Sequence, residues 1–445
     1  MGIKVAKFGG TSVADAKQIG KTVEIIRADA DRRMIVVSAP GKRFETDTKI
    51  TDLLYLLKTH MEQNAPYGQV LQIVRDRFLE TERELGVNAD VADEFRIIEA
   101  RLEEGASADY IASRGEYLSA KIVAAYLGYD FVDAAGLICF NAKGRFLPDE
   151  TRQALGAALS ARDRAVLPGF YGTHPDGTIK TFSRGGSDIT GALVAEAVNA
   201  EVYENWTDVS GFLMADPRIV ENPKGIDFIS YKELRELSYM GASVLHENAI
   251  YPVRLAGIPI NIRNTNRPEE KGTLIVSDEI AKERAGGRDI ITGIAGNRDF
   301  TVIAIYKNMM SAEAGFIRRV LGILEDYDVS VEHIPSGVDT LSLVIADRYL
   351  DGKLDDIVDD IERKAQADSV EVFENMSLIA TVGSGMASRK GVSATLFTAL
   401  ANVGVNIRMI DQGSSEMNII VGVENADFET AIKAIYAAFI GTDRA

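Results

Sequence analysis

Across residues 1–275, short apolar strands alternate with stretches of helical periodicity, and this alternation limits the possible folds more than any other feature. The strands it predicts are 34–37, 165–167, 201–204 and 258–262. The helices it predicts include 51–58, 70–79, 91–102, 107–127, 186–198 and 231–240. Strands joined through helices pair in parallel, because the helix returns the chain to the same end of the sheet. The sequence therefore predicts an α/β unit with a largely parallel sheet between helices.

An internal repeat organises the last third of the chain. Val302–Ile305 corresponds to Leu378–Thr381. The same spacing relates 341–343 to 417–419, so we expect one unbroken register through strand, helix and strand. Two copies are too few for a solenoid, which needs about three. The repeat therefore predicts two small α+β domains that pair with each other.

The charge of the chain restricts its partners. Of 445 residues, 66 are acidic and 49 are basic, which gives a formal net charge of −17. Such a chain repels polyanions, so we expect neither nucleic acid nor a membrane as a partner. No apolar run approaches the roughly 18 residues of a membrane span, and the first strand follows Met-Gly-Ile-Lys directly. These features predict a cytoplasmic protein.

The segment KFGGTS at residues 7–12 lies on a predicted strand-to-helix turn. Gly9 and Gly10 allow backbone N–H groups to approach an anion, and the N-terminus of the next helix adds partial positive charge. Lys7 places a full charge beside them. The segment predicts a phosphate site, with an ordinary strand-to-helix turn as the alternative.

A second glycine-rich turn, RGGSD at 184–188, opens another helix. Arg184 suits a carboxylate, because its planar guanidinium forms two parallel hydrogen bonds. Asp188 lies in the first helical turn, where it is placed to orient Lys7, to coordinate Mg²⁺ indirectly or to cap the helix.

Three further segments carry polar groups. Glu116, in SRGE at 113–116, lies on the apolar side of a helix. Burying its charge there is costly unless it meets a cation, which is either the amino group of a ligand or an internal arginine. Thr51 opens a helix, where it binds a ligand or serves as a cap. Residues 207–218 follow a strand and suit either a nucleotide or a plain loop.

Together these segments resemble one family, the aspartate kinases of the amino-acid kinase superfamily, over essentially the whole chain. The motifs that carry the resemblance are KFGGTS (7–12), SRGE (113–116), RGGSD (184–188), TDVSGFLMADPR (207–218), GASVLH (241–246), RNT (263–265) and SSEMNI (414–419). The resemblance implies an amino-acid kinase catalytic domain at 1–285. It also implies two ferredoxin-like ACT domains, at 299–370 and 375–445, with a strand at 290–295 contributed to the second.

The resemblance implies ATP-dependent phosphorylation of the side-chain carboxylate of L-aspartate to 4-phospho-L-aspartate, with Mg²⁺ carried by ATP and no metal held by the protein. It assigns catalysis to Lys7 and Asp188. The ATP-binding residues that it implies are Lys7, Gly9, Gly10, Gly186, Thr207, Asp208, Leu213 and Arg218. The aspartate-binding residues that it implies are Ser38, Thr51, Glu116, Arg184 and Ser187. Aspartate is ionised at neutral pH, since its pKa is about 4, so no general base is required.

The chain departs from the family pattern at two nucleotide positions. Ser243 stands where many relatives have a lysine that contacts phosphate, and Glu247 replaces a proline nearby. Leu213 stands where an aromatic residue often covers the nucleotide.

The resemblance further implies feedback regulation through the first ACT domain of a homodimer or a tetramer. The effector-binding residues that it implies are Met310, Gly315, Phe316, Ile317, Ser330, Val331, Glu332, Ser336 and Asp339. Glu332 and Asp339 offer two carboxylates, so we expect L-lysine as the effector, alone or with L-threonine; solvated surface acids are the alternative.

Two other functions stay open from the sequence. One is a sister kinase that acts on another carboxylate, such as glutamate, and the other is an amino-acid-sensing regulator that has lost catalysis. Trapping of acyl phosphates by hydroxylamine discriminates between all three.

Overall fold

The computed structural model describes residues 2–183, 185–241, 247–283 and 289–441. The chain divides into two compact units, which are described separately. The first combines Met1–Phe212, Gly225–Tyr231 and Val244–Lys282, and the second combines Leu213–Lys224, Lys232–Ser243 and Glu283–Ala445. Within the described ranges, no helix is both long and apolar enough to cross a bilayer.

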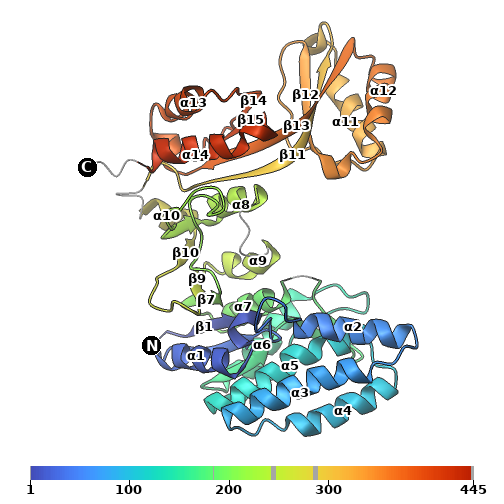
Figure 1. Ribbon diagram of the computed structural model, residues 1–445, viewed down its shortest axis with the longest axis vertical. Coiled ribbons are helices and arrows are strands. Elements are labelled where there is room, and N and C mark those ends of the chain that lie inside the picture. Colours follow the sequence, from blue (N-terminus) through green and yellow to red (C-terminus); the bar gives the residue numbers. More distant parts are fainter. Residues whose placement is uncertain (1, 184, 242–246, 284–288, 442–445) are drawn as a thin grey trace. The chain divides into compact units, whose positions relative to one another are not determined.

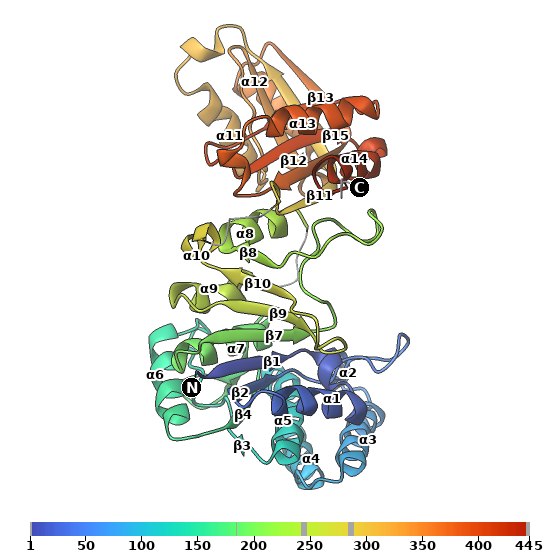
Figure 2. The ribbon, with the colours of Figure 1, turned by 90° about the vertical axis from the view of Figure 1, so that its left-hand side faces the viewer.

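The first unit is built on an eight-stranded sheet with the order β3-β4-β2-β1-β7-β9-β10-β8. Its strands are β1 (Lys4–Phe8), β2 (Arg32–Val37), β3 (Asp130–Phe131), β4 (Ala165–Pro168), β7 (Val202–Thr207), β8 (Phe228–Ser230), β9 (Ile260–Asn264) and β10 (Thr273–Val276). Neighbours pair in parallel except β9 and β10, and Figure 2 shows β1, β7, β9 and β10 following one another across the sheet. The predicted mostly parallel α/β sheet is confirmed. A separate hairpin joins β5 (Tyr171–Thr173) to β6 (Ile179–Thr181).

Helices cover both faces of this sheet. They are α1 (Ala16–Arg27), α2 (Ile50–Glu62), α3 (Gly68–Leu85), α4 (Val91–Glu103), α5 (Ala108–Leu127), α6 (Pro148–Ser160), α7 (Gly186–Ala197), α9 (Glu247–Leu255) and α10 (Asp278–Glu283). Ala6 and Phe8, alternate residues of β1, pack with α1–α5 in one apolar core, and Figure 1 shows α2–α5 lying side by side. Alternate side chains of a strand point to opposite faces, and α7 packs against β1, β2 and β7 with α6 and α9 beside it.

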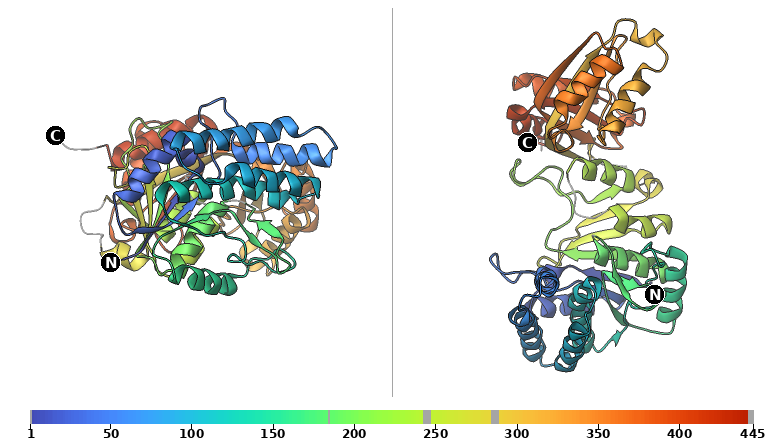
Figure 3. Two further views of the ribbon diagram at one scale, coloured as in Figure 1. Left: turned by 90° about the horizontal axis from the view of Figure 1, so that it is seen from below. Right: turned by 90° about the vertical axis from the view of Figure 1, so that its right-hand side faces the viewer.

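The second unit contains a five-stranded antiparallel sheet with the order β12-β11-β13-β15-β14, which the right-hand view of Figure 3 shows from a further side. Its strands are β11 (Gly293–Tyr306), β12 (Thr340–Ala346), β13 (Ser369–Val382), β14 (Met409–Asp411) and β15 (Asn418–Glu424). Its helices are α8 (Tyr231–Tyr239), α11 (Phe316–Asp326), α12 (Leu354–Lys364), α13 (Val392–Asn402) and α14 (Phe428–Phe439). Helix α11 packs with α12, and α13 packs with α14. This is the antiparallel α+β architecture expected for the repeat.

The two 14-residue strands β11 and β13 join the repeats into one sheet. Residues 293–297 of β11 pair with the second half of β13, while residues 369–373 of β13 pair with the second half of β11. Gly293 therefore corresponds to Ser369, at the same spacing as the repeated segments of the sequence. The leading part of each long strand thus pairs with the strand of the other repeat.

The predicted unbroken register of the repeat is wrong at the last strand. Helices α11 and α13, which begin at residues 316 and 392, keep the spacing of the sequence repeat. Strands β12 and β15, which begin at residues 340 and 418, are two residues further apart. Equivalent hydrogen bonds run from Glu332 N to Val344 O and from Arg408 N to Gly422 O, so the register still holds at 332 and 408. Two extra residues therefore lie in the turn between β14 and β15, where chain length varies most freely.

Side chains of α8 are fixed to residues at or near the five-stranded sheet within the second unit. Glu233 accepts hydrogen bonds from Thr292 Oγ1 at 2.7 Å and from Ser384 N at 2.8 Å. Glu236 accepts one from Asn418 Nδ2 at 2.6 Å. These contacts explain why α8 groups with the second unit although it precedes residues 244–282 in the sequence.

Candidate active site

Lys7 and Asp188 meet although they are far apart in the sequence. Lys7 Nζ lies 2.6 Å from Asp188 Oδ1, and both side chains are largely buried. The amide of Asn205 completes the group: its Nδ2 donates to Asp188 Oδ1 at 2.8 Å, and its Oδ1 accepts from Lys7 Nζ at 3.5 Å. Because β1 and β7 are neighbours, Lys7 and Asn205 share one register position. The lysine is therefore held from two sides.

Sequence reasoning missed Asn205. Its signal is an amide inside a strand whose flanking residues are buried, because a buried amide needs hydrogen-bond partners. Asn205 meets this need through the two side chains that the motifs identify, which makes it a candidate site residue.

The glycine-rich turn follows β1 at the carboxyl edge of the parallel strands. A Cβ on Gly10 would lie 2.9 Å from Ala39 O, so a larger residue would push the two loops apart. The N–H of Gly9 donates to Trp206 O at 2.9 Å. In this structure the Gly9 N–H is therefore used in fixing the turn to β7.

The start of α7 is open to an anion. Gly185 adopts φ = 60° as the N-cap, and no side chain of the described residues caps the helix. A helix N-terminus without a capping side chain presents free N–H groups and partial positive charge. Gly186 packs so closely that a Cβ would lie 2.6 Å from Phe170 Cδ2. Ser187 is half-buried in the same turn, and Arg184 lies outside the described residues.

Glu116 is a buried carboxyl group on α5. It is 5% exposed, and its Oε2 has no hydrogen-bond partner in the described part of the chain. Burial raises the pKa of Glu116 to about 8, although hydrogen bonding to the Ala39 backbone and the charge of Arg114 act in the opposite direction. A buried carboxyl group with a free oxygen is a site for a cation of a ligand.

The carboxyl ends of neighbouring strands bring further predicted residues to the same edge. Phe8 pairs with Val37 and with Trp206, so Gly9 and Ser38, which follow β1 and β2, and Thr207, which ends β7, lie at the same edge of three adjacent parallel strands. Ligands of open α/β sheets bind outside this edge. Thr51 is the second residue of α2, whose N-cap is Lys49, and this helix follows the loop that begins at Ser38.

The predicted nucleotide residues are divided between the two units. Asp208 is exposed next to Thr207, and its backbone oxygen accepts from Asn264 Nδ2 at 3.3 Å. Leu213 and Arg218 belong to the second unit, where Arg218 pairs with Asp216 at 2.6 Å. Ser243 lies outside the described residues.

The predicted effector residues lie on the first repeat. Met310 and Phe316 are buried in its apolar core, so only their backbone groups are available to a ligand. Gly315, with φ = 84°, is the N-cap of α11, and Ile317 is exposed behind it. Val331 packs on the core, while Ser330 and Ser336 are exposed and Asp339 is half-buried.

Glu332 is the one predicted effector residue with charged and polar partners described. The Tyr239 hydroxyl, from α8, donates to Glu332 Oε2, and Arg348 Nη2 lies 3.6 Å from Glu332 Oε1. Burial and the neighbouring Glu332 raise the pKa of Tyr239 to about 12. An effector that uses Glu332 must compete with this hydrogen bond.

Comparisons with known proteins agree along the whole chain. The amino acid kinase family matches residues 2–264, and an ACT domain matches residues 379–439. Aspartokinase 3 of Bacillus subtilis is 37% identical over 454 residues, which cover 98% of each chain. The solved aspartate kinase of Clostridium acetobutylicum is 53% identical with a TM-score of 0.90, covering 99% of this chain and 100% of that one.

A second solved relative, aspartokinase III of Escherichia coli, is 26% identical and covers 98% of this chain and 99% of its own in both forms compared. Its structure with aspartate and ADP, the R-state, gives a TM-score of 0.71. Its structure with lysine and aspartate, the T-state, gives a TM-score of 0.73.

Proposed function

Because the chain belongs to the aspartate kinases of the amino acid kinase family, we propose that it transfers the γ-phosphoryl group of ATP to the side-chain carboxylate of L-aspartate. The products are 4-phospho-L-aspartate and ADP, in the first step of the aspartate-family pathway to lysine, threonine and methionine. The observation that carries this proposal is the Lys7–Asp188–Asn205 cluster beside the glycine-rich turn.

The chemistry requires that one anion attack another. The aspartate carboxylate is already ionised at neutral pH, so the protein has to supply position and positive charge rather than a base. Lys7 would neutralise charge on the transferring phosphoryl group, while Asp188 and Asn205 keep its ammonium group in place. The open N-terminus of α7 would add N–H donors near the same group. ATP would carry its own Mg²⁺.

Glu116 and Arg184 would select the substrate. Glu116 has a free buried oxygen suited to the ammonium group of aspartate. Arg184 would bind the α-carboxylate, and Ser38, Thr51 and Ser187 would line the remainder of the pocket. Gly10, Gly186, Thr207 and Asp208, together with Leu213 and Arg218, would contact the nucleotide.

Regulation is proposed at the first ACT domain, with L-lysine as the effector, alone or with L-threonine. Lysine is bound in the T-state structure of the E. coli relative, and Glu332 of this chain offers a carboxylate to an ammonium group. We propose that the protein is cytoplasmic and forms a homodimer, or a tetramer, through its ACT domains. The proposed domain limits are 1–285 for the catalytic domain and 299–370 and 375–445 for the two ACT domains.

A hydroxylamine assay tests the function. Purified protein with ATP and Mg²⁺ should form a hydroxamate from aspartate and not from glutamate. Lys7→Ala should lower kcat by about 100-fold to 1,000-fold, as expected when one transition-state donor is lost. Lys4→Ala is the matched control, since it removes a lysine paired with Asp29 from the other end of β1.

The outcomes separate the candidate functions. If hydroxamate forms from glutamate and not from aspartate, the protein is a sister kinase rather than an aspartate kinase. No hydroxamate from either substrate, with aspartate or lysine still bound, would indicate a regulator without catalysis. Full activity of Lys7→Ala would refute the role given to Lys7.

A further inference from the structure

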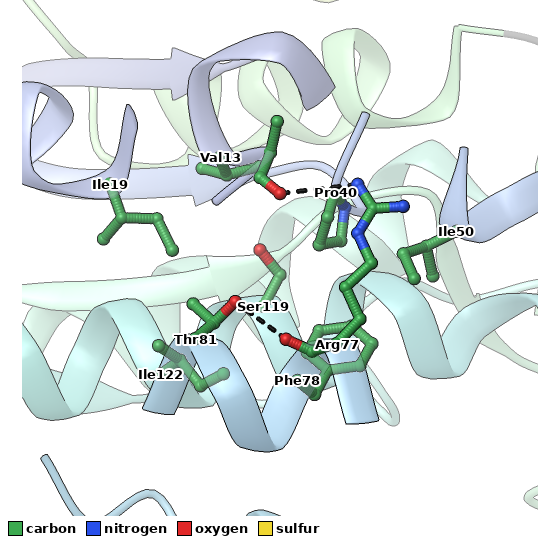
Figure 4. A pocket seen from close by; sticks show the side chains of 10 residues that line it. Val13, Ile19, Pro40, Ile50, Arg77, Phe78, Thr81, Ser119 and Ile122 are labelled. Carbon is green, nitrogen blue, oxygen red and sulfur yellow. Dashed lines mark hydrogen bonds between the residues drawn. The ribbon is translucent and has the colours of Figure 1, made fainter. Parts of the chain in front are cut away.

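Arg77 extends from α3 to the place where the loop 38–49 meets the segment that follows the glycine-rich turn. The residue is 5% exposed. Its Nη1 donates to Thr48 O at 2.8 Å, and its Nη2 donates to Gly41 O and, at 3.4 Å, to Ala14 O. Figure 4 shows its guanidinium group beside Pro40 and near Val13. One side chain therefore ties the loop 38–49 to the segment that follows the glycine-rich turn.

The loop 38–49 separates two parts of the site. Gly41 N donates to Gly10 O at 2.8 Å, which joins the loop to the glycine-rich turn. On its other side, a Cβ on Gly115 would lie 2.7 Å from Ala39 Cβ, so the loop also touches α5 next to Glu116. A shift of this loop changes the distance between the turn and Glu116, and hence between phosphate and substrate amino group.

The charge of Arg77 is costly where it lies. Burial lowers the pKa of Arg77, and its carboxylate partner, Asp47, lies 3.4 Å from Nη2 and is shared with Arg43. The cavity around Arg77 is lined mostly by apolar side chains, including Ile19, Phe78 and Ile122. An apolar residue would fill such a space at lower cost, because it avoids desolvating a cation. Filling the space therefore does not explain why an arginine lies here, and its hydrogen bonds to the backbone are the remaining explanation.

A guanidinium group is suited to binding several backbone carbonyl groups at once. It is planar and offers five donors in fixed directions, whereas a lysine presents a single charged point. Three carbonyl groups, two from the loop 38–49 and one from the segment after the glycine-rich turn, are held by one rigid plane.

We propose that Arg77 is a positioning residue for phosphoryl transfer. It touches neither substrate. It acts through Gly41 and Ala14, by holding the loop 38–49 so that the glycine-rich turn and Glu116 keep the separation that the reaction requires. The proposal rests on the aspartate kinase activity, but it concerns a residue outside the motifs of the family.

The test compares Arg77→Met and Arg77→Lys with Arg75→Met. Arg75 lies on the same helix and pairs with Glu99 at 2.9 Å, so its loss controls for removal of a helix α3 arginine. Assays run well below each melting temperature, with folding verified by circular dichroism. We expect both Arg77 variants to lose about 10-fold to 100-fold in kcat and to show a raised KM for aspartate. Arg75→Met should keep both constants.

A second measurement distinguishes positioning from stability. Arg77→Ala leaves room for a small guanidinium compound, so methylguanidine should restore part of kcat in this variant and leave Arg75→Met unchanged. Folded Arg77 variants with wild-type kcat and KM would overturn the proposal, and so would variants that do not fold at all, since Arg77 would then serve stability alone. Inactive wild-type protein would refute the proposed function instead.

Discussion

The buried carboxyl group of Glu116 leads to a prediction about pH. Burial shifts its pKa from 4.5 to about 8, a change worth about 5 kcal/mol against the ionised form. Binding of the aspartate ammonium group requires the ionised carboxylate. Below about pH 8 the free protein holds a proton on Glu116, so substrate binding must release it. We expect the Kd for aspartate to fall about tenfold per pH unit up to that pH and to level off above it.

Calorimetry measures this proton directly. Aspartate binding near neutral pH, in two buffers of different ionisation enthalpy, should show nearly one proton released. Glu116→Gln should bind aspartate more weakly and without this pH dependence, because an amide mimics the protonated acid. Glu94→Gln, which removes the partner of Lys121 at 2.6 Å, is the control for a charge change nearby. No proton release, with an aspartate Kd that is flat with pH, would refute the placement of the ammonium group at Glu116.

The same shift affects folding. Between pH 4.5 and about 8 the native protein holds a proton that the unfolded chain has lost, so this group makes the free energy of unfolding decrease as pH rises. Glu116→Gln should remove this decrease, which thermal melts of both proteins across the same pH range detect. Parallel curves for the two proteins would contradict the buried state of the carboxyl group.

Two further predictions concern contacts that only the structure reveals. Asn205→Leu keeps the shape of the side chain but removes its hydrogen bonds to Lys7 and to Asp188. In steady-state kinetics, kcat should therefore fall about 10-fold to 100-fold with little change in KM. An unchanged kcat would show that Asp188 alone positions Lys7. Tyr239→Phe removes the hydroxyl that donates a hydrogen bond to Glu332. The lysine concentration for half-inhibition should then fall about two-fold to ten-fold, the equivalent of one net hydrogen bond. An unaltered inhibition curve would show that Tyr239 does not compete with the effector for Glu332.

Much of the fold could be predicted because its signals are local. The helical periodicity at 107–127 matches α5 at Ala108–Leu127, and the apolar segment at 165–167 lies within β4. Periodicity reports which face of each element is buried, and strand–helix alternation then favours a parallel sheet. Gly9 and Gly10 likewise lie between β1 and α1, and Gly185 is the N-cap of α7, as expected.

The features that the sequence did not reveal depend on distant partners. The sequence shows that Gly9 has an available N–H, but not that Trp206 O accepts its hydrogen bond. It shows that Met310 and Phe316 lie near a helix start, but not that their side chains enter the core. The constant spacing between the two repeats is visible, whereas the extension of one turn is not, because turns leave no periodic pattern.

By itself the sequence determined the element order, the motifs and the charge of this protein, since each depends on residues that are near one another in the chain. The tertiary structure alone decided which side chains meet. Strand order places β7 beside β1, so Asn205 reaches Lys7; the packing of α3 against the loop 38–49 brings Arg77 to the carbonyl of Gly41. Such contacts arise from burial summed over the whole unit, and no local pattern records them.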